Sequence, residues 1–276
     1  MKQSSGQEFS FSKKDFERVR QVLYAKAGIK LADSKDSLVY SRLARRLRIL
    51  NIQSFQAYLD YLEKTPEEQQ PFINALTTNL TAFFREPHHF DALAEYLKKN
   101  KRKLTIWCAA SSTGEEPYSI AMIVAECFGS FDTPVSIVAS DIDSNVLEKA
   151  RNGIYSVDAV KKLSAQRCRQ FFHRGTGRNQ GKVRIVPELR KMVLYKQINL
   201  MHSNWALSYP IDIIFCRNVM IYFDKPTQVS ILKRMIALMP ANGMYVAGHS
   251  ENFNHQRELV TPMGQTIYAP VKSAPE

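Results

Sequence analysis

Acidic side chains follow two apolar stretches of the chain, where they could meet a bound ligand. Glu115 and Glu116 come shortly after the apolar run of residues 104–110, and Asp141 directly follows that of residues 135–140. Two carboxylates in one loop repel a pyrophosphate, so they disfavour a dinucleotide and favour a cationic or zwitterionic ligand. An acidic residue that closes a second buried strand commonly accepts hydrogen bonds from a ribose. Together these features favour S-adenosylmethionine, although helix capping explains either one alone.

Two further segments combine polar and aromatic residues in an apolar setting. Arg217 and Asn218 follow the apolar run of residues 211–216, with Tyr222 shortly after them. The segment of residues 77–86 places uncharged donors and Arg85 among large apolar residues, as an anchor for carboxylates would require. A packed aromatic side chain and a hinge with a surface arginine are the simpler interpretations of these segments.

A metal site is not expected. The four cysteines lack ligand spacing, and His88 and His89 are adjacent, so a helix would point them away from a single ion.

Apolar periodicity divides the chain into a helical part and an α/β part. Four helices are predicted in the first part, at residues 15–27, 38–49, 54–63 and about 67–80. Strands and helices then alternate, which predicts a doubly wound, mostly parallel sheet. Its strands are expected at residues 104–110, 135–140, 211–216, 244–247 and 265–268, and its helices at 117–127, 145–150 and 226–239.

A basic stretch interrupts this alternation. Residues 161–198 carry 11 basic side chains and one acidic side chain, which accounts for +10 of the formal net charge of +12. Residues 182–186 alternate charged and apolar side chains, and we expect them to form a strand that pairs with residues 192–198. We therefore predict an antiparallel β insertion at about 161–198.

The predicted domains are a helical domain at 1–76, a linker at 77–90 that contributes to the cofactor site, and an α/β domain at 91–276. Taken alone, the net charge indicates an acidic partner such as nucleic acid. No apolar run is long enough to cross a bilayer and the first residues lack the apolar core of a signal peptide, so a cytoplasmic location is expected.

Six strings in this order resemble the CheR family of chemoreceptor methyltransferases. They are TTNLTAFFRE, WCAASSTGEEPYSIAM, ASDIDSNVLEKA, QINL, IIFCRNVMIYFDKP and GHSE, and they span residues 77–251. The resemblance implies the class I fold of S-adenosylmethionine-dependent methyltransferases. It also implies methyl transfer to glutamate side chains of chemotaxis receptors, as a protein-glutamate O-methyltransferase of bacterial signal transduction that yields S-adenosylhomocysteine.

The resemblance also implies roles for individual residues. The cofactor-contacting positions are Asn79, Thr81, Arg85, Glu116, Asp141, Asn199, Leu200, Arg217 and Asn218, with Glu116 favoured over Glu115. Arg85 and Tyr222 occupy the positions that flank the transferred methyl group and are the expected catalytic residues. The positions expected to dock the receptor or its C-terminal tail are Arg42, Arg45, Arg46, Arg174, Gly175, Gly177 and Arg178.

Two other functions compete with this one. A nucleic-acid methyltransferase of the same fold is disfavoured, because the segment after residue 216 lacks the prolines that orient an exocyclic amine. A non-catalytic, cofactor-sensing adaptor is disfavoured because Arg85 and Tyr222 are both present. The partner is therefore expected to be an acidic helical receptor, with no nucleic acid and no membrane insertion, and nothing in the sequence requires more than a monomer.

Overall fold

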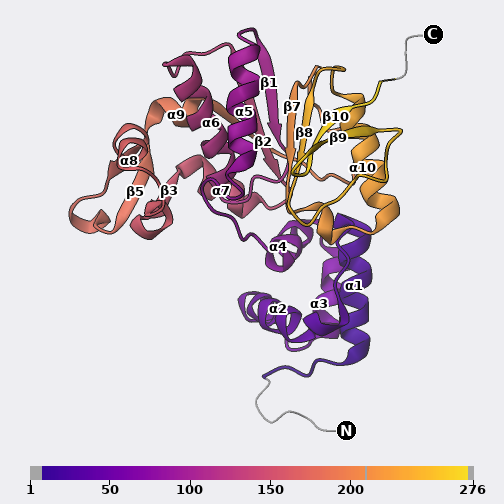
Figure 1. Ribbon diagram of the computed structural model, residues 1–276. Coiled ribbons are helices and arrows are strands. Elements are labelled where there is room, and N and C mark those ends of the chain that lie inside the picture. Colours follow the sequence, from indigo (N-terminus) through magenta and orange to yellow (C-terminus); the bar gives the residue numbers. More distant parts are fainter. Residues whose placement is uncertain (1–7, 209, 273–276) are drawn as a thin grey trace. The chain divides into compact units, whose positions relative to one another are not determined.

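The computed structural model describes residues 8–208 and 210–272, which divide into two units (Figure 1). One unit contains the chain up to Thr78 together with Tyr222–Asp224. The other contains Asn79–Ile221 and the chain from Lys225 onward. The outer ends of the predicted domains, residues 1–7 and 273–276, lie outside the described residues.

Helices form the first unit. They are α1 (Lys13–Ala27), the short η1 (Asp33–Lys35), α2 (Asp36–Leu50), α3 (Phe55–Lys64) and α4 (Pro66–Leu76). Ser12 begins α1 with a reciprocal capping box to Asp15, and Gly28 ends it in the left-handed conformation. Apolar faces of α1, α2 and α3 supply the core. The prediction that the fourth helix reaches residue 80 is wrong, because Thr77 is extended (φ −66°, ψ 149°) and the helix ends at Leu76.

A buried ion pair joins α2 to α4. The Arg46 guanidinium donates from Nε to one carboxylate oxygen of Glu68 at 2.9 Å and from Nη2 to the other at 2.6 Å. The Tyr58 hydroxyl also donates to Glu68, at 2.9 Å. Only 4% of Glu68 is exposed, so its charge depends on these donors.

A seven-stranded sheet forms the core of the second unit. Its strands are β1 (Leu104–Cys108), β2 (Val135–Asp141), β6 (Val193–Gln197), β7 (Ile213–Cys216), β8 (Met244–Ala247), β9 (Val260–Gly264) and β10 (Ile267–Pro270), in the order β6-β2-β1-β7-β8-β10-β9. The first five strands in that order are parallel, and β10 is antiparallel to both its neighbours. The predicted doubly wound, mostly parallel sheet is confirmed.

Helices accompany the strands of this sheet. They are α5 (His88–Lys99), α6 (Glu115–Phe128), α7 (Ser144–Asn152), α9 (Pro187–Lys191) and α10 (Lys225–Ala237). Buried side chains of α5 and α6 share one apolar cluster with β1, β2 and β7. In the described part of the chain, no helix combines the length and apolar character that a membrane span requires.

A separate three-stranded sheet forms the insertion. It contains β3 (Ile154–Ser156), β4 (Phe172–Arg174) and β5 (Lys182–Ile185) in the antiparallel order β3-β5-β4, with α8 (Ala165–Phe171) before β4. The prediction that residues 192–198 pair with residues 182–186 is wrong. Those residues form β6, which pairs in parallel with β2, and Val193 and Tyr195 are buried in the main core. The small sheet therefore begins before residue 161 and ends at Ile185.

Replacing Arg46 tests the role of its ion pair. Arg46→Ala leaves the buried Glu68 carboxylate without its bidentate partner, so we expect it to lower the free energy of unfolding by about 3 kcal/mol. The exposed neighbour Arg45 is the matched control, and Arg45→Ala should change that energy by less than about 0.5 kcal/mol. Urea unfolding measures both, and equal stabilities of the two variants would contradict a structural role for Arg46.

Candidate functional site

Four parallel strands of the main sheet end at one edge, and each carries predicted site residues there. The strands β6, β2, β1 and β7 are successive neighbours. Asn199 follows β6, Asp141 ends β2, and Arg217 follows β7. The loop of residues 109–114 leads from β1 to Glu115 and Glu116 at the start of α6. The edge thus brings together residues that lie up to 102 positions apart, at the place where open α/β sheets bind ligands.

The loop after β1 is tightly constrained. Gly114 has φ 101°, and a Cβ atom there would lie 2.8 Å from the Tyr155 hydroxyl and 2.9 Å from Cβ of Ala150. Only glycine fits this position without strain. The same Tyr155 hydroxyl donates to the carbonyl oxygen of Thr113 at 2.8 Å. The insertion strand β3, which carries Tyr155, therefore helps to fix the loop.

Asp141 is held at the end of β2 by two backbone donors. Its carboxylate accepts from the Ser112 N–H at 2.8 Å and from the Asp143 N–H at 3.0 Å. Burial raises its pKa to about 6, against the lowering effect of these hydrogen bonds. The cap of the following helix is Asp143, which accepts from Asn145 and Val146. Helix capping therefore does not explain Asp141.

The segment that follows the helical unit in sequence is tied to the same edge. The Asn79 side-chain amide donates to Asp143 at 2.9 Å, and the main-chain carbonyl oxygen of Asn79 accepts from the Ser112 hydroxyl at 3.0 Å. Thr81 follows and is half-buried. Asn79 is thus brought next to the β1 and β2 ends, and its side chain contacts a neighbour of Asp141.

Arg217 is a deeply buried charge of the site. Its side chain is fully buried, and its guanidinium donates to the Glu116 carboxylate, to the Arg85 carbonyl oxygen at 2.5 Å, and lies 3.3 Å from Glu86. Burial acts to lower the pKa of Arg217, but the two carboxylates outweigh it and the net direction is upward. The other oxygen of Glu116 accepts from the Cys108 thiol at 3.1 Å. Both oxygens of Glu116 therefore have partners within the protein.

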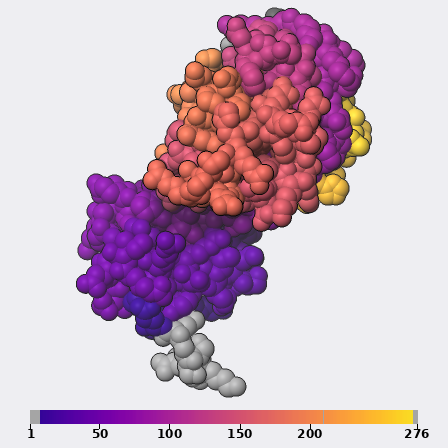
Figure 2. Space-filling view, turned by 90° about the vertical axis from the view of Figure 1, so that its left-hand side faces the viewer, coloured from indigo at the N-terminus to yellow at the C-terminus, as the bar shows by residue number. Residues whose placement is uncertain are grey.

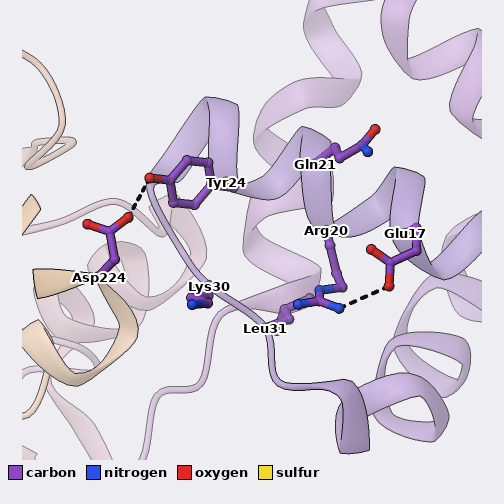
Figure 3. A pocket seen from close by; sticks show the side chains of 7 residues that line it. All are labelled: Glu17, Arg20, Gln21, Tyr24, Lys30, Leu31 and Asp224. Atoms are coloured by element: carbon purple, nitrogen blue, oxygen red, sulfur yellow. Dashed lines mark hydrogen bonds and ion pairs between the residues drawn. The ribbon is translucent and has the colours of Figure 1, made fainter.

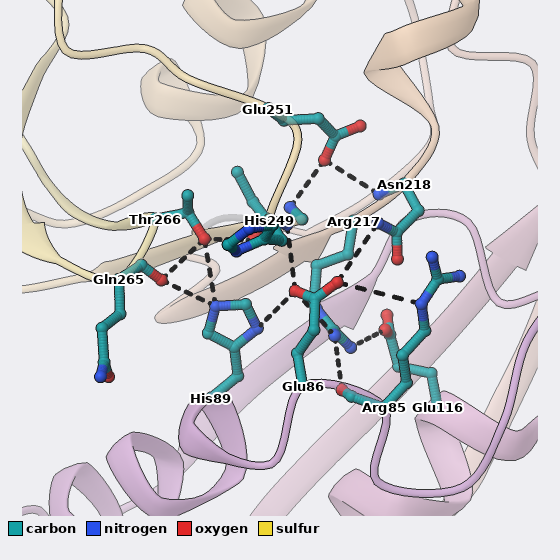
Figure 4. Close-up of polar contacts among 12 residues, drawn as sticks. Arg85, Glu86, His89, Glu116, Arg217, Asn218, His249, Glu251, Gln265 and Thr266 are labelled. Carbon is teal, nitrogen blue, oxygen red and sulfur yellow. Dashed lines mark hydrogen bonds and ion pairs between the residues drawn. The ribbon is translucent and has the colours of Figure 1, made fainter.

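Glu86 connects this group to a second loop, and sequence reasoning missed it. Its carboxylate accepts from the His249 N–H at 3.0 Å and from the Asn218 side chain at 3.4 Å (Figure 4). Burial raises its pKa, yet the nearby Arg217 guanidinium brings the net value below normal. The only signal for Glu86 in the sequence was its position directly after Arg85, a predicted site residue.

His89 lies against Glu86 as a neutral imidazole. Its Nε2 is 2.9 Å from the carbonyl oxygen of Gln265, so this nitrogen carries the proton, and burial lowers its pKa to about 4. Its Nδ1 lies 3.5 Å from the Glu86 carboxylate and forms no hydrogen bond, so this contact is not an ion pair in the neutral state.

One group of metal-ligating atoms converges in the described part of the chain. Single ligand atoms of Glu86, His88 and His89 lie within 4.8 Å of one another, and the two imidazole centroids are 4.2 Å apart. The expectation that adjacent histidines would point apart is therefore wrong, since the two rings lie against each other at the start of α5. A cation there would be repelled by Arg217, which lies 3.3 Å from Glu86, so we assign no metal to this group.

The two expected catalytic residues fall in different units. The Arg85 side chain is 37% exposed, and its Nη1 donates to the Leu80 carbonyl oxygen at 3.1 Å. Tyr222 is grouped with the helical unit, where its carbonyl oxygen accepts from the Lys30 N–H at 2.8 Å. Their pairing about a methyl group stays a prediction.

Asn199 follows the end of β6, and Leu200 is buried beside it.

The predicted docking residues differ in how freely they face solvent. Arg42 donates to the Thr77 carbonyl oxygen at 2.6 Å and Arg46 binds Glu68, whereas Arg45 is exposed. Arg174 and Arg178 are exposed on the insertion, whose salmon-coloured surface faces the viewer in Figure 2.

The two glycines of this segment shape the turn between Arg174 and Arg178. The Gly175 N–H donates to the Lys182 carbonyl oxygen at 2.9 Å, and Gly177 has φ 55°.

A cavity of about 310 Å³ lies in the helical unit (Figure 3). It is lined by Glu17, Arg20, Gln21, Tyr24, Lys30, Leu31 and Asp224. Arg20 forms ion pairs with Glu17 and Asp33, and Tyr24 donates to Asp224. Because Glu17, Arg20, Tyr24 and Asp224 already have partners and no lining residue was predicted as a site residue, we assign no function to this cavity.

Comparison with known proteins adds to this geometry. The family described as "CheR methyltransferase, SAM binding domain" matches residues 79–269, and "CheR methyltransferase, all-alpha domain" matches residues 14–77. The chain is 55% identical to "Chemotaxis protein methyltransferase 2" of Pseudomonas aeruginosa, over 96% of this chain and 95% of that protein.

It is 49% identical to "Chemotaxis protein methyltransferase" of Escherichia coli, over 92% of this chain and 90% of that protein. A third relative, of the same name from Salmonella typhimurium, is also 49% identical and is covered over 92% of its length. Together the two family matches span nearly all of the described residues, and the chain therefore belongs to the CheR methyltransferase family.

Proposed function

We propose that the chain transfers a methyl group from S-adenosylmethionine to glutamate side chains of chemotaxis receptors, and so forms glutamate methyl esters. The observation that carries this proposal is the convergence of Asp141, Glu115 and Glu116 at adjacent strand ends, in a chain whose family has an S-adenosylmethionine-binding domain. The names of its relatives support a receptor substrate. The cytoplasmic region of such receptors would place the reaction in the cytoplasm.

The charges of the site suit a cationic cofactor. Arg217 neutralises one of its two carboxylate neighbours, Glu116 and Glu86, which leaves this trio at −1. Asp141 and Glu115 are also buried, and within the described residues they accept hydrogen bonds but form no ion pair. The donor set therefore fits S-adenosylmethionine, with Asp141 accepting from the ribose hydroxyls. Glu115 is as good a candidate as Glu116 for binding the cofactor, because both oxygens of Glu116 already have partners.

The proposed chemistry needs positioning rather than a strong base. When bound, S-adenosylmethionine supplies a methyl group carried on a positively charged sulfur. A carboxylate oxygen of the receptor would bond to the methyl carbon while the carbon–sulfur bond breaks, which would leave neutral S-adenosylhomocysteine. A glutamate side chain has a normal pKa near 4.3 and is already anionic at neutral pH. Arg85 and Tyr222 would orient that carboxylate by hydrogen bonds, since alignment of this kind can lower a barrier by roughly 7–11 kcal/mol.

Transfer of a labelled methyl group tests the proposed function. With tritiated S-adenosylmethionine and chemoreceptor-containing membranes, we expect label on the receptor that mild base releases as methanol. Label on added nucleic acid, or label on receptor that resists base, would contradict glutamate O-methylation. Absence of any transferred label would favour a non-catalytic adaptor.

The raised pKa of Asp141 predicts a pH dependence of cofactor binding. Above about pH 6 the carboxylate is ionised and accepts from the ribose, whereas below it a proton occupies one acceptor position. Affinity should therefore fall as the pH drops from 7.5 to 5. The native state binds this proton more tightly than the unfolded state, so without cofactor the same group costs stability as the pH rises from about 4 to 6.

The variant Asp141→Asn separates the pH dependence due to Asp141 from that of other titrating groups. It should weaken cofactor binding at pH 7.5 by about tenfold, through loss of a charge-assisted hydrogen bond, and remove the step near pH 6. The exposed Asp132 supplies the control, Asp132→Asn, which should leave the affinity at pH 7.5 and the step near pH 6 unchanged. Calorimetric titration measures the affinity, and an unaltered pH step in Asp141→Asn would refute the assignment.

Tyr222→Phe tests the proposed orienting role of the hydroxyl. We expect the rate of methyl transfer to fall, while the dissociation constant of the cofactor stays within a few fold, because the hydroxyl would contact the substrate carboxylate. Tyr61→Phe, at a partly exposed position of α3, is the matched control. Full activity of Tyr222→Phe in single-turnover measurements would exclude the role.

We also propose that the basic insertion docks the acidic receptor. Arg174 and Arg178 are exposed there, and Arg45 is the predicted docking arginine of α2 that faces solvent. Long-range attraction between exposed charges is screened by salt. Receptor methylation at low receptor concentration should fall between 0.05 and 0.5 M salt, and Arg178→Ala should flatten that dependence. A rate that does not respond to salt would eliminate electrostatic docking.

A further inference from the structure

We propose that Glu251 is a positioning residue of the methyl-transfer site, whose carboxylate fixes the loop that presents Arg217 and Asn218. Glu251 ends the GHSE string, to which the proposed function assigns no role. This inference rests on that function, because it concerns the cofactor site of the same unit.

The Glu251 carboxylate accepts four backbone hydrogen bonds. One oxygen accepts from the Val219 N–H at 2.9 Å and the Met220 N–H at 2.7 Å. The other accepts from the Asn218 N–H at 2.9 Å and the Gly248 N–H at 2.6 Å (the Asn218 contact is drawn in Figure 4). Three of these four donors are consecutive residues of the loop after β7, so a single side chain sets the course of that loop.

The loop is shaped around this carboxylate. Asn218 is in the left-handed region, with φ 57°, a conformation that asparagine tolerates better than most non-glycine residues, and its N–H donates to Glu251 from there. A Cβ atom on Gly248 would lie 2.4 Å from the Asn218 side-chain nitrogen and 2.9 Å from the Glu251 carboxylate. Gly248 therefore lets the two loops approach, and its own N–H completes the set of donors.

Burial makes the carboxylate sensitive to the loss of these donors. Only 4% of Glu251 is exposed, and burial raises its pKa above normal although the four N–H groups act to lower it. A charge this deeply buried costs free energy unless it is well paired. Conversely, removing the acceptor leaves buried N–H groups unsatisfied, and the loop would move to find new partners.

Movement of this loop would reach the cofactor site directly. Arg217 precedes Asn218 and binds Glu116, while the Asn218 side chain binds Glu86. The Glu86 carboxylate also accepts from the His249 N–H, one residue after Gly248. Glu251 and Glu86 thus both bind the loop after β7, through Asn218, and the loop after β8, through Gly248 or His249.

The variant Glu251→Gln isolates the role of the carboxylate. Glutamine has nearly the same shape, but one oxygen becomes an amide nitrogen that cannot accept, so two of the four N–H groups lose their partner. We expect the dissociation constant of S-adenosylmethionine, measured by calorimetry, to rise at least about tenfold with a stoichiometry near one. Glu251→Asp keeps the charge and should recover part of that loss. The exposed Glu258 provides the control, Glu258→Gln, with native affinity.

The stoichiometry separates positioning from folding. A purely structural role would lower the melting temperature and the fraction of binding-competent protein, while the folded fraction would keep native affinity and KM. That result, or native affinity in Glu251→Gln, would overturn the inference. If Glu251→Gln does not fold, Gly248→Ala is the second variant. It leaves the carboxylate intact but crowds Asn218, and unchanged affinity there would also overturn it.

The native protein distinguishes this inference from the proposed function. If the native chain neither binds the cofactor nor methylates receptor, the proposed function fails. If the native chain does both and Glu251→Gln matches it, only the role of Glu251 fails.

Discussion

The site depends on one constraint: the Arg217 guanidinium is fully buried and must be paired. Its partners come from separate parts of the chain. Glu116 lies in the first turn of α6, and the Arg85 carbonyl and Glu86 carboxylate lie in the segment before α5. Satisfying one charge therefore requires that this segment, the start of α6 and the end of β7 come together. The same requirement assembles the edge of the sheet where the predicted cofactor residues lie.

The net charge of the chain separates into regions with different roles. The buried groups at the strand ends are mostly acidic and suit a cationic cofactor. Most of the excess positive charge lies within residues 161–198, and exposed arginines of β4 and of the turn after it carry part of it. The total of +12 alone would indicate nucleic acid, but its distribution fits a protein that meets an acidic partner away from the strand ends where the predicted cofactor residues lie.

Sequence patterns predicted the elements better than their tertiary partners. Continuous apolar runs identified β1, β2, β7 and β8, because strands buried on both faces need such runs. The predicted partner strand of β6 was wrong. The alternating pattern of β6 fits either sheet, and only the burial of Val193 and Tyr195 in the main core shows to which sheet it belongs. Glu116 was correctly placed at the strand ends, but its pairing with Arg217, 101 residues away, has no local signal. Glu251 was missed as a site residue for a related reason: its four donors are backbone N–H groups, which leave no pattern in the sequence. Glu86 was missed because its partners Arg217, Asn218 and His249 lie more than 130 residues away along the chain.

A double-mutant cycle on Arg217 and Glu116 tests most directly whether this ion pair organises the site. Arg217→Met, Glu116→Gln and the double variant are compared by urea unfolding and by calorimetric titration of S-adenosylmethionine. The account predicts a coupling energy of about 2 kcal/mol or more in unfolding, together with weakened cofactor binding in Arg217→Met. Effects on stability that add to within about 0.5 kcal/mol, with native cofactor affinity in Arg217→Met, would contradict it.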